Sequence, residues 1–123
     1  MSKTILIVED NENNMMLVRD VLQIKGYTVL EATTGTEGVR LALAARPDLV
    51  LIDIQLPDID GITVFAQIRA NEATKGIPLL AVSASVMPDE KQKIISSGFD
   101  AYITKPLNMK SFVETVEKFI GKA

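Results

Sequence analysis

Short apolar segments alternate with longer amphipathic ones along the chain. Three of the short segments are almost wholly aliphatic, as is typical of parallel strands buried on both faces: Thr4–Val8, Leu49–Ile52 and Leu79–Val82. Two more mixed runs, Thr28–Ala32 and Ala101–Ile103, predict further strands, and the first of them suits an edge of a sheet. The pattern therefore predicts five strands, with a helical segment after each.

The helical segments have recognisable ends. Thr34 followed three residues later by Glu37 is typical of a capping box, and Pro88 is a favourable first residue of a helix. Gly26, Gly98 and Gly121 are typical of helix ends. We expect helices over about 13–25, from 34 to before Pro47, from 61 onward, from 88 to 98 and from 108 to 121.

Strands that alternate with helices predict an α/β fold with a parallel sheet. The chain of 123 residues fits one domain, so we expect a single doubly wound (βα)5 domain over residues 1–123, flavodoxin-like, with no output domain. Right-handed crossovers place helices on both faces of the sheet, and the expected strand order is 2-1-3-4-5. In such sheets ligands bind at the carboxyl ends of the strands, near the switch point between the first and third strands.

Composition excludes several kinds of chemistry. The net charge of −3 and a pI near 4.9 argue against a nucleic-acid binder. With no cysteine and no histidine, thiolate sites, disulfides and histidine-based triads are excluded, so any metal must be a hard ion held by oxygen. The apolar run near the N-terminus is too short for a signal peptide or a membrane span, and a cytoplasmic protein is expected.

Polar side chains follow four of the predicted strands and should meet at one edge of the sheet. Glu9 and Asp10 follow the first strand, Asp53 the third, Ser83 the fourth and Lys105 the fifth. Three neighbouring carboxylates repel one another unless one takes up a proton or a cation binds between them. A hard divalent ion, a lysine and a hydroxyl are the groups that phosphoryl transfer to a carboxylate needs.

Each of these residues has a commoner role when it is taken alone. A single aspartate such as Asp10 is more often a cap or turn residue, Ser83 could serve in the same way, and Lys105 could be a solvated surface lysine. Their coincidence at one edge favours the chemical interpretation. Asp58, Asp60, Asp89 and Asp100 are interpreted as turn or cap residues without a chemical role.

The chain resembles the receiver domain of two-component response regulators over its full length. The resemblance rests on Ile5–Asn11, on Leu51–Pro57 with the Asp60–Gly61 pair after it, on Val82–Ala84 and on Tyr102–Pro106. Within that family the chain resembles stand-alone receivers of the DivK kind. Glu9-Asp10 stands where an Asp-Asp pair is more frequent, and Ser83 where threonine is frequent.

The resemblance implies a role for each matched position. Asp53 is the phosphoacceptor, with Lys105 and Ser83 contacting the phosphoryl group. Asp10, Asp53 and the backbone carbonyl of Gln55 would bind Mg²⁺ or Mn²⁺, and Glu9 would act through a metal-bound water. Ser83 and Tyr102 would be switch residues, and a cis peptide bond would precede Pro106. The side chains of Gln55 and Ser85 would flank the phosphoryl group and affect its hydrolysis.

The resemblance also implies partners. The expected function is phosphorelay signalling, in which the chain accepts a phosphoryl group from phosphohistidine of a histidine kinase or histidine phosphotransfer protein and switches a protein-binding surface. That surface would comprise the fourth helix, fifth strand and fifth helix. The first helix has two apolar stripes, 17-21-24 and 15-18-22, which indicate either a wide core contact or a docking patch that includes Met15. A monomer that binds a downstream protein and no membrane is expected.

Three other functions remain open from the sequence. A phosphatase of the haloacid dehalogenase type would need an acid/base aspartate at the position of Gln55. A flavin-binding module would need a phosphate-binding loop where Glu9, Asp10 and Glu12 stand, and the chain has few aromatic residues to stack a flavin. A receiver-like scaffold that is never phosphorylated is the third alternative.

Overall fold

A computed structural model describes residues 3–84 and 87–123 of the chain. Its centre is a parallel sheet of five strands in the order β2-β1-β3-β4-β5, which confirms the predicted fold and strand order. The strands are β1 Thr4–Val8, β2 Thr28–Ala32, β3 Leu49–Asp53, β4 Leu79–Ser83 and β5 Ala101–Thr104.

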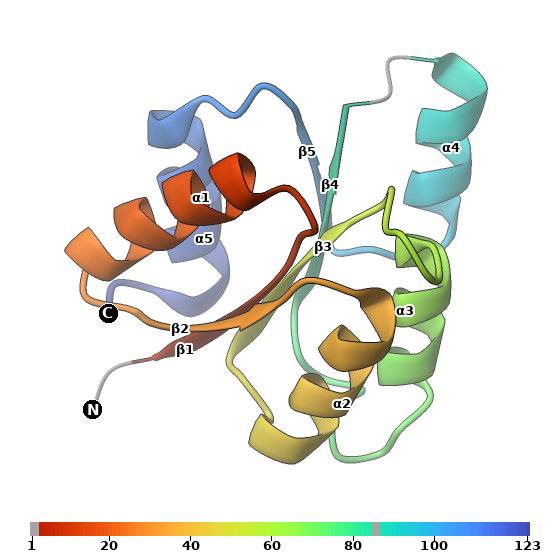
Figure 1. Cartoon of the computed structure of the whole chain (residues 1–123), viewed down its shortest axis with the longest axis horizontal. Helices are drawn as coiled ribbons and strands as arrows, with labels where there is room; N and C mark the ends of the chain where they lie inside the picture. The colour runs from red at the N-terminus through yellow and green to blue at the C-terminus, as the bar shows by residue number, and fades with distance from the viewer. Residues whose placement is uncertain (1–2, 85–86) are drawn as a thin grey trace.

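Helices cover both faces of the sheet (Figure 1). α1 and α5 lie on one face, while α2, α3 and α4 lie on the other. The helices are α1 Glu12–Ile24, α2 Gly35–Ala45, α3 Gly61–Arg69, α4 Pro88–Ser96 and α5 Met109–Ile120. None of the helices within the described ranges has the length and apolar character needed to cross a bilayer.

The alternation of side chains along the strands divides the core into two layers. In β1, Ile5 and Ile7 pack with the residues of α1 and α5, whereas Leu6 and Val8 pack with those of α2 and α3. All residues of β3 and β4 are buried, as expected for central strands. β2 has exposed and half-buried positions, which agrees with its place at an edge.

Side-chain caps begin four of the five helices. Asn11, Thr34, Asp60 and Asn108 each accept a hydrogen bond from a backbone amide three residues later. The capping box at α2 forms only in part, because the Glu37 carboxylate binds Arg40. α4 begins with Pro88 and has no side-chain cap bond.

Three strands extend one residue beyond their apolar runs, in each case at the carboxyl end. β3 includes Asp53, β4 includes Ser83 and β5 includes Thr104. The register pairs Asp53 with Val82, and Ser83 with Thr104. Asp53 and Ser83 were expected at the ends of these strands, and the backbone pairing includes them, which holds two candidate functional residues within the sheet.

The buried face of α1 does not allow Met15 to take part in the predicted docking patch. Met15, Val18 and Leu22 form the buried face, so Met15 belongs to the core and cannot contribute to a docking patch. Met16 and Leu17 are each 49% exposed and Ile24 is 83% exposed. The helix thus has more apolar surface than its core contact uses, as the sequence indicates. Leu17 and Ile24 belong to the predicted 17-21-24 stripe, whereas Met16 lies outside both predicted stripes.

Candidate functional site

The sheet brings the polar residues together through its register. Val8 pairs with Ile52, so the next residues lie side by side: Glu9 directly after β1, and Asp53 at the end of β3. The amide of Lys105 donates to the carbonyl oxygen of Ser83 at 2.9 Å, which extends the β4–β5 pairing to the lysine. The predicted meeting of these residues at one edge is therefore present in the structure.

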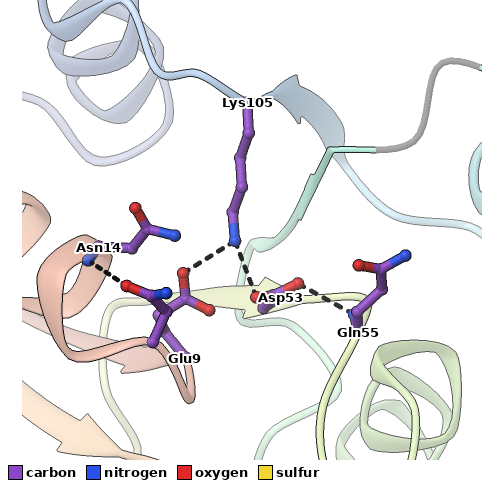
Figure 2. Close-up of polar contacts among 6 residues, drawn as sticks. Glu9, Asn14, Asp53, Gln55 and Lys105 are labelled. Carbon is purple, nitrogen blue, oxygen red and sulfur yellow. Dashed lines mark hydrogen bonds and ion pairs between the residues drawn. The ribbon is translucent and has the colours of Figure 1, made fainter.

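Lys105 links two buried carboxylates, as Figure 2 shows. Its Nζ lies 2.9 Å from Glu9 Oε1 and 2.9 Å from Asp53 Oδ2. Only 6% of the Glu9 side chain and 7% of the Asp53 side chain are exposed. The other oxygen of Asp53, Oδ1, accepts the amide of Gln55 at 2.9 Å. Asp53 is thus held from both sides at the end of β3.

Glu9 is the least satisfied member of the cluster. Its Oε2 is buried and has no hydrogen-bond partner among the residues that the structure describes. Burial, followed by the neighbouring Asp53 carboxylate, raises the pKa of Glu9 to about 7 despite the opposing effect of Lys105. Near neutral pH, keeping this carboxylate charged therefore lowers the stability of the folded protein.

Lys105 remains charged in the same surroundings. Burial alone would lower its pKa, but the hydrogen bonds and charges of Glu9 and Asp53 outweigh burial, and the pKa is raised. The cluster therefore contains one fixed positive charge opposite three acidic groups, because Asp10 lies beside the other two.

The acidic residues fit a metal ion. One oxygen from each of Glu9, Asp10 and Asp53 lies within 4.8 Å of the others. A cation near them would reduce the repulsion, and the unpartnered Oε2 of Glu9 marks a place where a positive charge or an ordered water would be favourable. Oxygen ligands of this kind suit Mg²⁺. Asp10 is exposed, which leaves the cluster open to solvent.

The remaining predicted residues lie around this cluster. Ser83 is fully buried at the end of β4, and Gln55 is exposed two residues after Asp53. Tyr102 is half-buried in β5, with the Nζ of Lys91 5.8 Å from its ring centroid. The peptide bond between Lys105 and Pro106 is cis, the isomer that the resemblance implies. Ser85 lies outside the described residues.

Sequence reasoning missed the polar wall on one side of the site. An open cleft beside Asp53 is lined by the first turn of α1, including Asn11, Asn13 and Asn14, together with Asp10 and Gln55. Asn11 also caps α1 through the amide of Asn14 at 3.0 Å (Figure 2). The unbroken polar run from Asp10 to Asn14 was the available signal, because it continues past the N-cap Asn11 into the first turn of α1.

A parallel sheet with an acidic cluster and a lysine at the switch point defines a receiver-type α/β domain. The family model of the response regulator receiver domain matches residues 5–117. The chain belongs to this family.

Curated relatives and solved structures that are similar to the chain include other response regulators and receiver domains. The chain is 40% identical to the polar-differentiation response regulator DivK of Brucella ovis over 123 residues, which are all of both chains. The receiver domain of sensor histidine kinase PA1611 from Pseudomonas aeruginosa, with a magnesium ion coordinated in its active-site cleft, is 30% identical with a TM-score of 0.91, and the match covers 99% of this chain and 100% of that one. Chemotaxis protein CheY4 of Vibrio cholerae is 26% identical with a TM-score of 0.89, over 97% and 99% of the two chains.

Proposed function

We propose that the protein is a phosphorelay switch whose phosphoacceptor is Asp53. One observation carries the proposal: Asp53 ends the central strand β3 with Lys105 at 2.9 Å and two further carboxylates within 4.8 Å. A carboxylate that is paired with a cation, as Asp53 is with Lys105, can act as a nucleophile without a general base. The absence of histidine from the sequence is therefore no obstacle.

The proposed reaction moves a phosphoryl group from phosphohistidine to Asp53. A carboxylate oxygen of Asp53 attacks phosphorus, the P–N bond breaks, and the imidazole of the donor leaves. Lys105, which pairs with Asp53 Oδ2 before the reaction, then faces the new phosphoryl oxygens. The hydroxyl of Ser83 donates to another of these oxygens. Gln55 flanks the group on the solvent side, where we propose that it affects hydrolysis together with Ser85.

Asp10, Asp53 and the backbone carbonyl of Gln55 would hold Mg²⁺ or Mn²⁺, with Glu9 acting through a metal-bound water. Such an ion, when bound, neutralises charge on the phosphoryl oxygens and on the acidic cluster. The proposed ligands come from the β1–α1 segment and from the end of β3, which the β1–β3 pairing holds next to each other.

The signal would leave the site through β4 and β5. Phosphorylation adds roughly 1.5 to 2 negative charges and strong acceptor oxygens, to which Ser83 and Lys105 would respond. Tyr102 lies on β5 next to Lys91 of α4, so a change of its rotamer would alter the surface of α4, β5 and α5. α4 buries Ile94 but leaves Ile95 47% exposed, and this thin core contact suits an element that shifts.

We propose a histidine kinase or histidine phosphotransfer protein as donor, and a protein as the downstream target. The exposed Met16 and Leu17 on α1 offer an apolar docking surface, and Met16 lines a groove that also includes Glu9 and Asp10 of the acidic cluster. The net charge of −3 favours a protein target over nucleic acid. A cytoplasmic monomer that acts as a signalling domain, with no turnover of outside substrates, completes the proposal.

Intact mass spectrometry tests the proposal. Wild type is incubated with acetyl phosphate and MgCl₂, beside Asp53→Asn and a sample with chelator. The expected result is a mass gain of one phosphoryl group in the wild type alone. The same incubation with a phosphorylated histidine phosphotransfer domain follows, and the absence of a gain from both donors would refute the proposal and favour the scaffold alternative.

Docking on α1 has its own comparison. Met16→Asp should slow transfer from the phosphotransfer domain while leaving transfer from acetyl phosphate unchanged. Equal effects on both donors would show that α1 affects the site itself and is not a docking surface.

A further inference from the structure

The loop that connects β3 to α3 carries Gln55 and is fixed at its base. The amide of Ile54 donates to the carbonyl of Val82 at 3.0 Å, and the amide of Gly61 donates to the carbonyl of Ile54 at 2.9 Å. The amide of Gln55 binds Asp53 Oδ1. These bonds hold the two ends of the loop together and leave residues 56–59 to be positioned by other contacts.

The far part of the loop is bound to another helix by Asp58. Asp58 Oδ1 accepts the amide of Gly35 at 2.7 Å, and Oδ2 accepts the amide of Thr36 at 2.9 Å and its hydroxyl at 2.5 Å. The three donors all lie in the first turn of α2, which carries the positive end of the helix dipole. The hydroxyl and amide of Thr36, followed by the amide of Gly35, hold the pKa of Asp58 well below its usual range.

Packing between the same two segments is close. A Cβ atom at Gly35 would lie 2.4 Å from Ile59 Cγ1 and 3.1 Å from the carbonyl oxygen of Ile59. Glycine is therefore required at the start of α2 for the loop to approach it. The bonds of Asp58 and this contact together place the loop against α2 over a separation of more than twenty residues in the sequence.

We infer that Asp58 is a positioning residue for the metal site. By binding the loop to α2 it fixes residues 56–59 and so the orientation of the peptide group between Gln55 and Leu56, whose carbonyl is a proposed metal ligand, before any ion arrives. A loop that is already ordered loses less conformational entropy on binding, so the metal binds more tightly. The inference rests on the proposed function, since it assigns a partner to the ligand set proposed there.

Two measurements separate positioning from ordinary helix capping. Isothermal titration calorimetry gives the Kd for Mg²⁺, and amide hydrogen exchange in chelator reports the order of the loop at Gln55 without any metal. The variants are Asp58→Ala, Asp58→Asn and Thr34→Ala, all measured at temperatures where circular dichroism shows them folded. Thr34→Ala is the matched control, because it removes the N-cap bond of the same helix, from the amide of Glu37 at 3.1 Å, and removes none of the hydrogen bonds to Asp58.

Asp58→Ala should raise the Kd for Mg²⁺ roughly tenfold, at the lower end of the range for residues that support metal ligands. It should also speed exchange at Gln55. Asp58→Asn keeps one acceptor oxygen and should give an intermediate Kd, whereas Thr34→Ala should leave the Kd within about twofold of wild type.

An unchanged Kd in Asp58→Ala, or an equal rise in Thr34→Ala, would overturn the inference and leave the metal site standing. A wild type that binds Mg²⁺ no better than Asp10→Asn would overturn the metal site and the inference with it.

Discussion

Replacing Asp10 by asparagine removes one of three carboxylates whose oxygens lie within 4.8 Å of one another. Two unit charges at that distance repel by about 0.9 kcal/mol in a medium like water and by about 3.5 kcal/mol at an effective dielectric constant of 20. Asp10 is exposed, so the smaller value applies. With repulsion from Glu9 and Asp53 and partial compensation by Lys105, the substitution should stabilise the metal-free protein by roughly 1 kcal/mol.

The same substitution should weaken the response to magnesium. Ligand at one hundred times its Kd stabilises a protein by about 2.7 kcal/mol, and a tenfold weaker Kd reduces this to about 1.4 kcal/mol. Asp10→Asn should therefore be more stable than wild type in chelator yet gain less from Mg²⁺. Helix capping does not confuse the comparison, because Asn11 is the N-cap of α1.

Urea unfolding followed by circular dichroism, in chelator and in MgCl₂, measures both effects. The control is Glu114→Gln, an exposed position on α5 where the substitution also changes the net charge from −3 to −2. A gain of about 1 kcal/mol corresponds to a rise in Tm of about 4 °C for a domain of this size. A loss of stability in chelator, or an unchanged gain from Mg²⁺, would refute the reasoning.

Three further predictions concern residues around the site. Lys105→Met leaves two buried carboxylates without their cation and should lower the free energy of unfolding by about 3 kcal/mol above pH 7, where Glu9 is charged. The loss should be smaller below the raised pKa of Glu9. Urea unfolding measures this beside the control Lys122→Met, and equal stabilities of the two variants would contradict the prediction. Gly61→Ala puts a Cβ 2.6 Å from the carbonyl oxygen of Asp53 and should cost about 2 kcal/mol, whereas Gly76→Ala, with nothing within 4 Å, should be neutral in the same assay. The lowered pKa of Asp58 means that its contribution to stability is present above the ordinary value of 3.8 and is lost as the pH falls; the acid unfolding profile of Asp58→Asn should therefore be flatter, and an identical profile would contradict the assignment.

Most of the fold followed from local sequence pattern. Continuous aliphatic runs and capping residues such as Thr34, Asp60 and Asn108 act within a few residues, so strands and helix starts could be predicted within one or two positions. The phase of α1 could not, because the consecutive apolar residues Met15 to Val18 fit more than one buried face. Only packing against β1 and α5 decides that Met15 is buried and Met16 exposed.

The site was predictable where strand ends determine it, and less so where loops do. The positions of Glu9, Asp53 and Lys105 follow from the strand order, since parallel strands end at one edge. The contacts of Asp58 do not, because they join the β3–α3 loop to the first turn of α2, and this approach depends on the packing of α2 against the β3–α3 segment. An aspartate that serves only in a turn and one that, like Asp58, hydrogen-bonds to a distant helix have the same local sequence pattern.

Reduction of the phosphorylated protein with borohydride, followed by peptide mass spectrometry, tests the central claim most directly. Borohydride converts an aspartyl phosphate to homoserine and leaves free carboxylates unchanged. After incubation with acetyl phosphate and MgCl₂, homoserine is expected at position 53 and at no other acidic residue. Homoserine at Asp10 or Glu9, or an unmodified Asp53 in protein that has gained a phosphoryl group, would contradict the account.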